Sequence, residues 1–209
     1  MKFDDFRKKT GKFPLINVQT LKLEDIFSHS LRVQLLRWQK RKKIIALRKN
    51  LYILNSEDRR INPSRLYISN QIYSPSYVSL EYALSIYGLI PEKVTDVTCI
   101  TTKKTAEFEN DLGRFVYQHI KVSCFAGFVE QKDEAHLPYF IAVPEKAVVD
   151  FIYLNLNRFQ KNYGEVLTES FRFQSLESLK RSKLLYYAKL FKTRKLLAVI
   201  KELTSLLKE

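Results

Sequence analysis

Residues 28–41 carry a helical pattern that constrains the N-terminal fold more than any other feature of the sequence. Leu31, Leu35 and Trp38 recur at helical spacing, which places them on one apolar stripe of an amphipathic helix. A serine before this stripe, Ser28 or Ser30, can cap the helix by accepting an otherwise unpaired backbone N–H. The opposite side of the helix is rich in Gln, Lys and Arg.

Two short strand patterns follow this helix at once. The runs IIALR and LYIL flank Lys49 and Asn50, which predicts a β-hairpin with a two-residue turn. Asn50 suits such a turn because asparagine tolerates positive φ better than most residues. A recognition helix followed by a basic hairpin is the order found in a winged helix-turn-helix, and residues 1–60 are predicted to form one.

Positive charge gathers at the two ends of the chain. Residues 1–60 hold 16 Lys and Arg against 6 Asp and Glu, and residues 171–209 hold 10 against 3. Residues 61–170, between these ends, hold 10 Lys and Arg against 13 Asp and Glu, so the net charge of +14 comes from the two ends of the chain. This distribution favours an anionic polymer as partner, because each neutralised phosphate releases a counterion.

The helix and hairpin supply side chains suited to duplex DNA. Arginine can bond guanine with two hydrogen bonds and glutamine can bond adenine in the same way, whereas cations at the helix end and hairpin tip would meet phosphates. The predicted DNA-binding residues are Ser30, Arg32, Gln34, Arg37, Lys40, Arg41, Arg48 and Lys49.

Residues 61–209 are predicted to form a second, α+β domain beyond a polar linker at 55–63. Helices are expected after Pro63 and across 74–91, the latter capped by Ser76, and then a small, mostly antiparallel sheet from Val94 onward. Another helix begins at Pro144, and the basic C-terminal segment is helical, with an apolar stripe formed by Leu196, Ile200, Leu203 and Leu207.

The sequence offers little for catalysis. It has no phosphate-binding glycine loop, and its three histidines lie far from one another, so we expect no enzyme, no metal and no cofactor. One alternative is a metal-dependent nuclease that uses Asp133, Glu134, Glu145 and Lys146. The favoured interpretation is that Glu145 and Lys146 charge a helix start, with Asp150 pairing to Lys146 one turn later.

Cellular placement follows from what the sequence lacks. The sequence contains no run of 18 apolar residues, which is about the length needed to span a membrane, and its first residues do not have the pattern of a secretory signal. Cys99 and Cys124 are expected to be buried and reduced, as in a cytoplasmic protein.

Three stretches resemble the AbiEi-type antitoxins, which are also described as transcriptional regulators of viral defence. They are LLRWQKRKKIIALRKNLYIL (35–54), YSPSYVSLEYALSIYGLIPE (73–92) and IAVPEKAVVDFIYL (141–154). The resemblance implies a winged-helix repressor that binds inverted repeats in its own promoter, as a homodimer on the DNA. It also implies an antitoxin domain acting against a nucleotidyltransferase toxin in a type IV toxin–antitoxin system for abortive infection and phage defence.

Two departures accompany the resemblance. The family's wing turn usually contains Arg-Gly, where this chain has Lys49-Asn50, and residues from 171 onward match no pattern of the family. A stand-alone winged-helix transcription factor is therefore kept as a second alternative.

Overall fold

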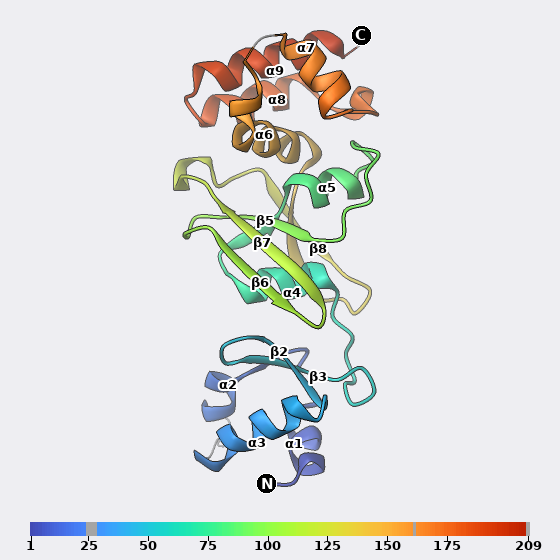
Figure 1. Cartoon of the computed structure of the whole chain (residues 1–209), viewed down its shortest axis with the longest axis vertical. Helices are drawn as coiled ribbons and strands as arrows, with labels where there is room; N and C mark the ends of the chain where they lie inside the picture. Colours follow the sequence, from blue (N-terminus) through green and yellow to red (C-terminus); the bar gives the residue numbers. More distant parts are fainter. Residues whose placement is uncertain (24–28, 161, 208–209) are drawn as a thin grey trace.

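The computed structural model describes residues 1–23, 29–160 and 162–207, and it shows an α+β protein (Figure 1). Three parts follow one another along its long axis: an N-terminal unit of helices with a small sheet, a larger central sheet, and a group of C-terminal helices. The chain passes through these parts in order, so the two basic ends of the sequence lie at opposite ends of the molecule.

The N-terminal unit packs three helices against a short sheet. Its elements are α1 (Phe3–Thr10), β1 (Ile16–Asn17), α2 (Val18–Leu23), α3 (His29–Lys40), β2 (Ile44–Arg48) and β3 (Leu51–Leu54). The strands pair antiparallel in the order β1-β3-β2. Apolar side chains from all of these elements form one core, namely Phe3, Phe6, Ile16, Leu21, Leu31, Leu35, Trp38, Ile44 and Leu54.

The predicted helix and hairpin are confirmed as α3 and as β2 with β3. Asn50 has φ of 66°, the left-handed conformation that the turn requires. The cap prediction was wrong for Ser30, because Ser30 is itself part of the helix α3 (His29–Lys40). Ser28, the other proposed cap, lies outside the described residues.

The central sheet has six strands in the order β6-β7-β5-β4-β9-β8. Antiparallel pairs alternate with two parallel ones, β7 with β5 and β4 with β9. The strands are β4 (Ser76–Val78), β5 (Val97–Thr101), β6 (Ala106–Asn110), β7 (Gly113–His119), β8 (Phe128–Lys132) and β9 (Pro138–Ala142). The sheet is therefore mixed, with three antiparallel pairs and two parallel ones, and it is larger than the small sheet that the sequence predicted.

The larger size of the sheet is explained by β4, a strand that the sequence did not predict. Residues 74–91 were expected to be one helix capped by Ser76, but Ser76–Val78 pair with β5 on one side and β9 on the other. The helix α5 (Leu80–Ile86) begins at Leu80, where the chain turns with a φ of 59°. Aromatic and β-branched side chains at Tyr77 and Val78 gain more from packing inside the sheet than from helical propensity.

The remaining helices cover the sheet and build the C-terminal end. They are α4 (Arg65–Ile72), α6 (Pro144–Leu154), α7 (Tyr163–Glu165), α8 (Arg181–Leu190) and α9 (Arg194–Leu206). Ser64 caps α4 by accepting the Tyr67 N–H at 3.1 Å. As predicted, Pro144 opens α6, and Leu196, Ile200 and Leu203 are buried on α9.

The hairpin connects the N-terminal unit to the central part. Leu47, Leu51 and Ile53 belong to the main core, which continues through the sheet to α9. The Asn110 side-chain amide donates to the Leu47 carbonyl at 3.3 Å. Arg7 pairs with Asp58 at 2.9 Å, which fastens the predicted linker to α1. A domain boundary near residue 60 stays a prediction.

Candidate nucleic-acid interface

The inner face of α3 fixes the orientation of the helix. Leu31, Leu35 and Trp38 are buried, and the Trp38 ring lies 5.4 Å from the Phe3 ring and 4.8 Å from the Phe6 ring, between centroids. These aromatic contacts with α1 add to the area that burial removes from water. Because these contacts fix the rotation of α3 about its own axis, the opposite face of the helix lies toward solvent.

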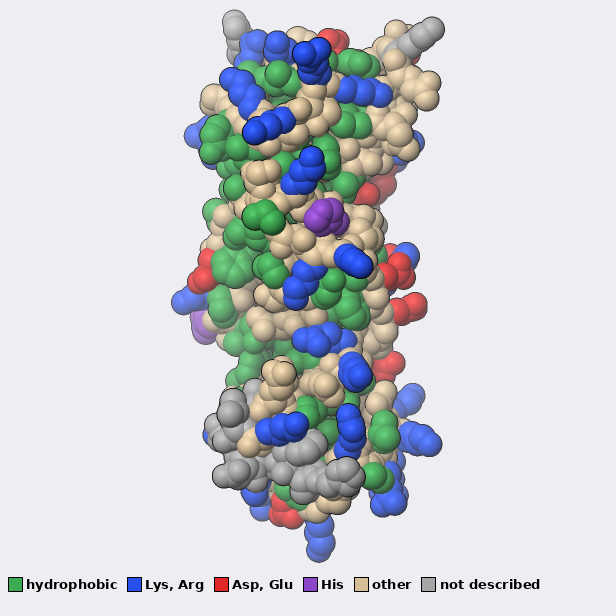
Figure 2. Space-filling model, turned by 90° about the vertical axis from the view of Figure 1, so that its left-hand side faces the viewer, with side chains coloured by type: hydrophobic (Ala, Val, Ile, Leu, Met, Phe, Trp, Pro, Cys, Tyr) green, Lys and Arg blue, Asp and Glu red, His purple; other side chains and the backbone are tan. Residues whose placement is uncertain are grey.

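Cations line that outer face. Arg32, Arg37 and Lys40 are exposed, and the basic run continues through Arg41 and Lys42 in the turn after α3. Within the described chain, none of these side chains pairs with a carboxylate. Figure 2 shows Lys and Arg side chains distributed along the length of one face of the molecule, including both of its ends.

The other two predicted contact residues on α3 differ in exposure. Ser30 is exposed. Gln34 is half-buried at the edge of the apolar face. With the oxygen and nitrogen of its amide exchanged, the oxygen accepts from the Met1 amino group at 3.0 Å and the nitrogen donates to the Met1 carbonyl at 3.2 Å. Gln34 therefore belongs to the seam between α3 and the start of the chain rather than to the outer face.

The hairpin tip presents one cation outward and turns the other aside. Lys49 is exposed. Arg48 is half-buried, its Nε is shielded from solvent without a protein partner among the residues described, and its Nη1 donates to the Lys49 carbonyl at 3.3 Å. Of the two, Lys49 is the more exposed.

Two apolar residues on the outer face of α3 escaped the sequence interpretation. Val33 is 51% exposed and Leu36 is 57% exposed, and both lie among the cations Arg32, Arg37 and Lys40. A signal was present, because residues 33 and 36 fall opposite the Leu31–Leu35–Trp38 stripe on a helical wheel. Exposed apolar side chains on such a helix can contact thymine methyl groups in a major groove.

Two acidic residues of the nuclease hypothesis, Asp133 and Glu145, have contacts that serve the fold, whereas Glu134 is exposed. Asp133 accepts backbone N–H groups of Ser64, Ala135 and Leu137 at 2.8 to 3.0 Å. Glu145 lies in the first turn of α6, as predicted, and accepts the Lys180 N–H at 3.2 Å. Across the described ranges, no three His, Cys, Asp or Glu side chains are grouped so that they could hold a metal ion.

Lys146 departs from its predicted place at a charged helix start. It pairs with Asp150 as expected, but both side chains are fully buried. Tyr77 donates to Asp150 at 2.9 Å and accepts from the Lys146 ammonium at 2.8 Å, and Ser79 also donates to Asp150 at 2.9 Å. The cluster is enclosed, and its hydrogen bonds join α6 to the β4–α5 segment.

Comparison with other proteins adds no relationship to this geometry. Neither the family models nor the curated proteins compared with the chain match it.

Two further expectations concern the whole chain. Cys99 and Cys124 are buried free thiols, as predicted, and burial raises the pKa of Cys99 to about 12. No helix in the described part of the chain is both long and apolar enough to cross a membrane.

Proposed function

We propose that this protein is the antitoxin and autoregulatory repressor of a type IV toxin–antitoxin operon, and that residues 1–60 bind promoter DNA as a winged helix. The observation that carries the DNA-binding half is the outer face of α3, where Arg32, Arg37 and Lys40 are exposed together without a carboxylate partner in the described ranges. The element order of helices, recognition helix and hairpin supports the same assignment.

The residues divide by task on this proposal. Arg32 and Arg37 read guanine edges in the major groove, while Val33 and Leu36 contact thymine methyl groups. Phosphate contacts come from exposed cations that surround this face, namely Lys40, Arg41, Lys42 and Lys49. Gln34 and Arg48 take no direct part, because their side chains are occupied or turned inward.

The antitoxin half rests on the resemblance of residues 73–92 and 141–154 to the AbiEi-type antitoxins. In the structure these stretches supply β4, α5, the end of β9 and α6, which form the centre of the main core. A body of this size exceeds what groove reading requires. We therefore assign to residues 61–209 the activity against a nucleotidyltransferase toxin, with a stand-alone transcription factor as the competing assignment.

DNA reading is tested by selecting binding sites from random duplexes with the full-length protein. The wild type should enrich an inverted repeat, and Arg37→Ala should relax the preference at one base pair of each half-site, with a loss of about 1–3 kcal/mol there. Lys104→Ala, which removes an exposed cation from the loop between β5 and β6, should select the wild-type site. If the wild type prefers no sequence over competing random duplex at physiological salt, the repressor proposal is wrong.

Antitoxin activity is tested by co-expression with the product of the adjacent gene. The test uses the full-length chain, because Leu47, Leu51 and Ile53 belong to the main core and removal of residues 1–60 would expose it. A triple variant, Arg32→Ala with Arg37→Ala and Lys40→Ala, should lose promoter repression and still rescue growth. Failure of the wild type to rescue growth would favour the stand-alone regulator.

A further inference from the structure

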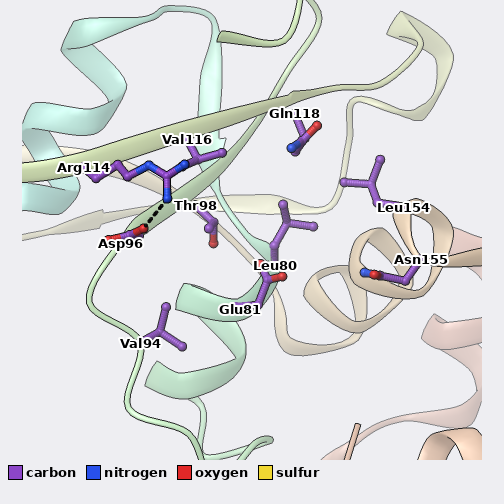
Figure 3. Close-up of a pocket in the computed structure, with 10 residues that line it drawn as sticks. All are labelled: Leu80, Glu81, Val94, Asp96, Thr98, Arg114, Val116, Gln118, Leu154 and Asn155. Carbon is purple, nitrogen blue, oxygen red and sulfur yellow. Dashed lines mark hydrogen bonds and ion pairs between the residues drawn. The ribbon is translucent and has the colours of Figure 1, made fainter. Parts of the chain in front are cut away.

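A cavity of about 470 Å³ opens in the central part, away from the outer face of α3 (Figure 3). Its walls come from β5, β7, the first residues of α5 and the end of α6. Figure 3 shows Glu81 at the start of α5, facing the cavity between Thr98 and Asn155. The cavity lies in the part of the chain where acidic residues outnumber basic ones.

Glu81 is the charged group of this cavity that lacks an opposite charge. Its side chain is half-buried, and no Lys or Arg of the described residues forms an ion pair with it. Burial raises the pKa of Glu81, which means that its charge is incompletely solvated. The Thr98 hydroxyl fixes the local backbone by donating to the Ser79 carbonyl at 2.7 Å and accepting the Tyr82 N–H at 3.0 Å.

Arg114, the cation at the rim, is already engaged. Its guanidinium donates to both carboxylate oxygens of Glu107, at 2.6 and 2.8 Å, and to Asp96 at 3.1 Å. An anionic ligand would therefore find no free cation among the described residues of the wall. The charge that the cavity offers to a ligand is the negative charge of Glu81.

The neutral part of the wall offers hydrogen-bond acceptors and aliphatic surface. The Asn155 amide donates to the Phe151 carbonyl at 2.9 Å, which leaves its own oxygen as an acceptor, and the Gln118 side chain lies across from it. The aliphatic surface comes from Leu80, Val94, Val116 and Leu154. A matching ligand carries positive charge, several donors and a short hydrocarbon chain.

We propose that this cavity binds a guanidinium group carried on an aliphatic chain, either an arginine side chain of a partner or a free alkylguanidine. A guanidinium has five N–H donors and no acceptor, which suits a carboxylate flanked by amide oxygens. Because the protein carries a net charge of +14, its overall field repels cations. Binding of a guanidinium group would therefore depend on local recognition in the cavity.

The test compares n-butylguanidinium with n-butylurea, its neutral analogue of the same shape, by calorimetric titration of the full-length protein. Butylguanidinium should bind more tightly. Glu81→Gln should weaken its binding by about tenfold to a hundredfold and leave butylurea unaffected, because it removes the charge and keeps the shape. Glu130→Gln, on exposed strand β8, is the matched control and should bind both probes as the wild type does.

A second variant keeps the proposal testable if Glu81→Gln folds poorly. Gln118→Glu adds a carboxylate to the wall and should tighten butylguanidinium binding. Short peptides containing arginine or citrulline identify the source: stronger binding of the arginine peptide than of butylguanidinium indicates a protein side chain, and the reverse indicates a small molecule. Equal binding of butylguanidinium and butylurea, or no effect of either variant, would overturn the proposal.

Discussion

At the scale of single residues, the pair formed by Lys146 and Asp150 shows what spacing can and cannot reveal. They are four positions apart on a helix, so their pairing was predictable from the sequence. Their complete burial was not, because Tyr77 and Ser79, which complete the hydrogen bonding, come from a segment that was expected to be helical. An error in one element therefore concealed the environment of another.

Lys146→Met should destabilise the protein by about 3–5 kcal/mol at neutral pH, because it leaves the Asp150 carboxylate buried without its cation. Burial already raises the pKa of Asp150, and removal of the ammonium raises that pKa further. A carboxyl whose pKa is raised by folding contributes stability at low pH that is lost as the pH rises through that pKa.

The measurement is urea unfolding of wild type and Lys146→Met at pH 4.5 and pH 7.5. The difference in unfolding free energy should be smaller at the lower pH. Lys189→Met, an exposed position on α8, should change stability by no more than about 0.5 kcal/mol at either pH. A penalty for Lys146→Met that is equal at both pH values would contradict the ionic account of the cluster.

At the scale of elements, the predictions succeeded where one periodicity persisted. The three-position stripe of α3 and the two runs around Asn50 were long enough to identify a helix and a hairpin. The strand β4 has three residues and is continued at once into α5, so its pattern merged with the helical one. Strands of this length are defined by their neighbours, here β5 and β9, which local sequence does not reveal.

The hairpin turn allows a direct test of this local reasoning. Asn50→Gly should leave stability unchanged or raise it slightly, because glycine adopts positive φ without a steric penalty. Asn50→Val should cost about 1–2 kcal/mol, because a β-branched residue is strained in this conformation. Thermal unfolding of both variants measures the effect, and equal stability of the two would refute the role assigned to the turn.

At the scale of the whole molecule, charge composition predicted that the ends differ from the middle, and the fold places those ends far apart. The position of each cation was less predictable. Gln34 lies at the edge of α3 beside Met1 rather than on its outer face, and Arg48 at the hairpin tip is half-buried, with its Nε shielded from solvent. Such contacts depend on tertiary packing, which helical periodicity does not describe.

The salt dependence of DNA binding measures how many cations take part. The slope of log K against log salt should fall by about one for each cation that no longer meets a phosphate. Lys40→Ala with Arg41→Ala should therefore reduce the slope by about two, whereas Gln34→Ala should leave it unchanged. Filter binding between about 50 and 200 mM salt provides the measurement. An unchanged slope in the double variant would show that Lys40 and Arg41 do not contact phosphates.

The shared hairpin has a mechanical consequence. The β2–β3 hairpin contributes side chains to both hydrophobic clusters, and Arg7 and Asp133 contact the segment between them at its two ends. These contacts restrict rotation of the N-terminal unit relative to the central sheet. If a duplex bound to the N-terminal unit bent or twisted it, the β2–β3 hairpin would transmit that force to the six-stranded sheet. A force applied at the N-terminal end of the molecule would therefore reach its central part.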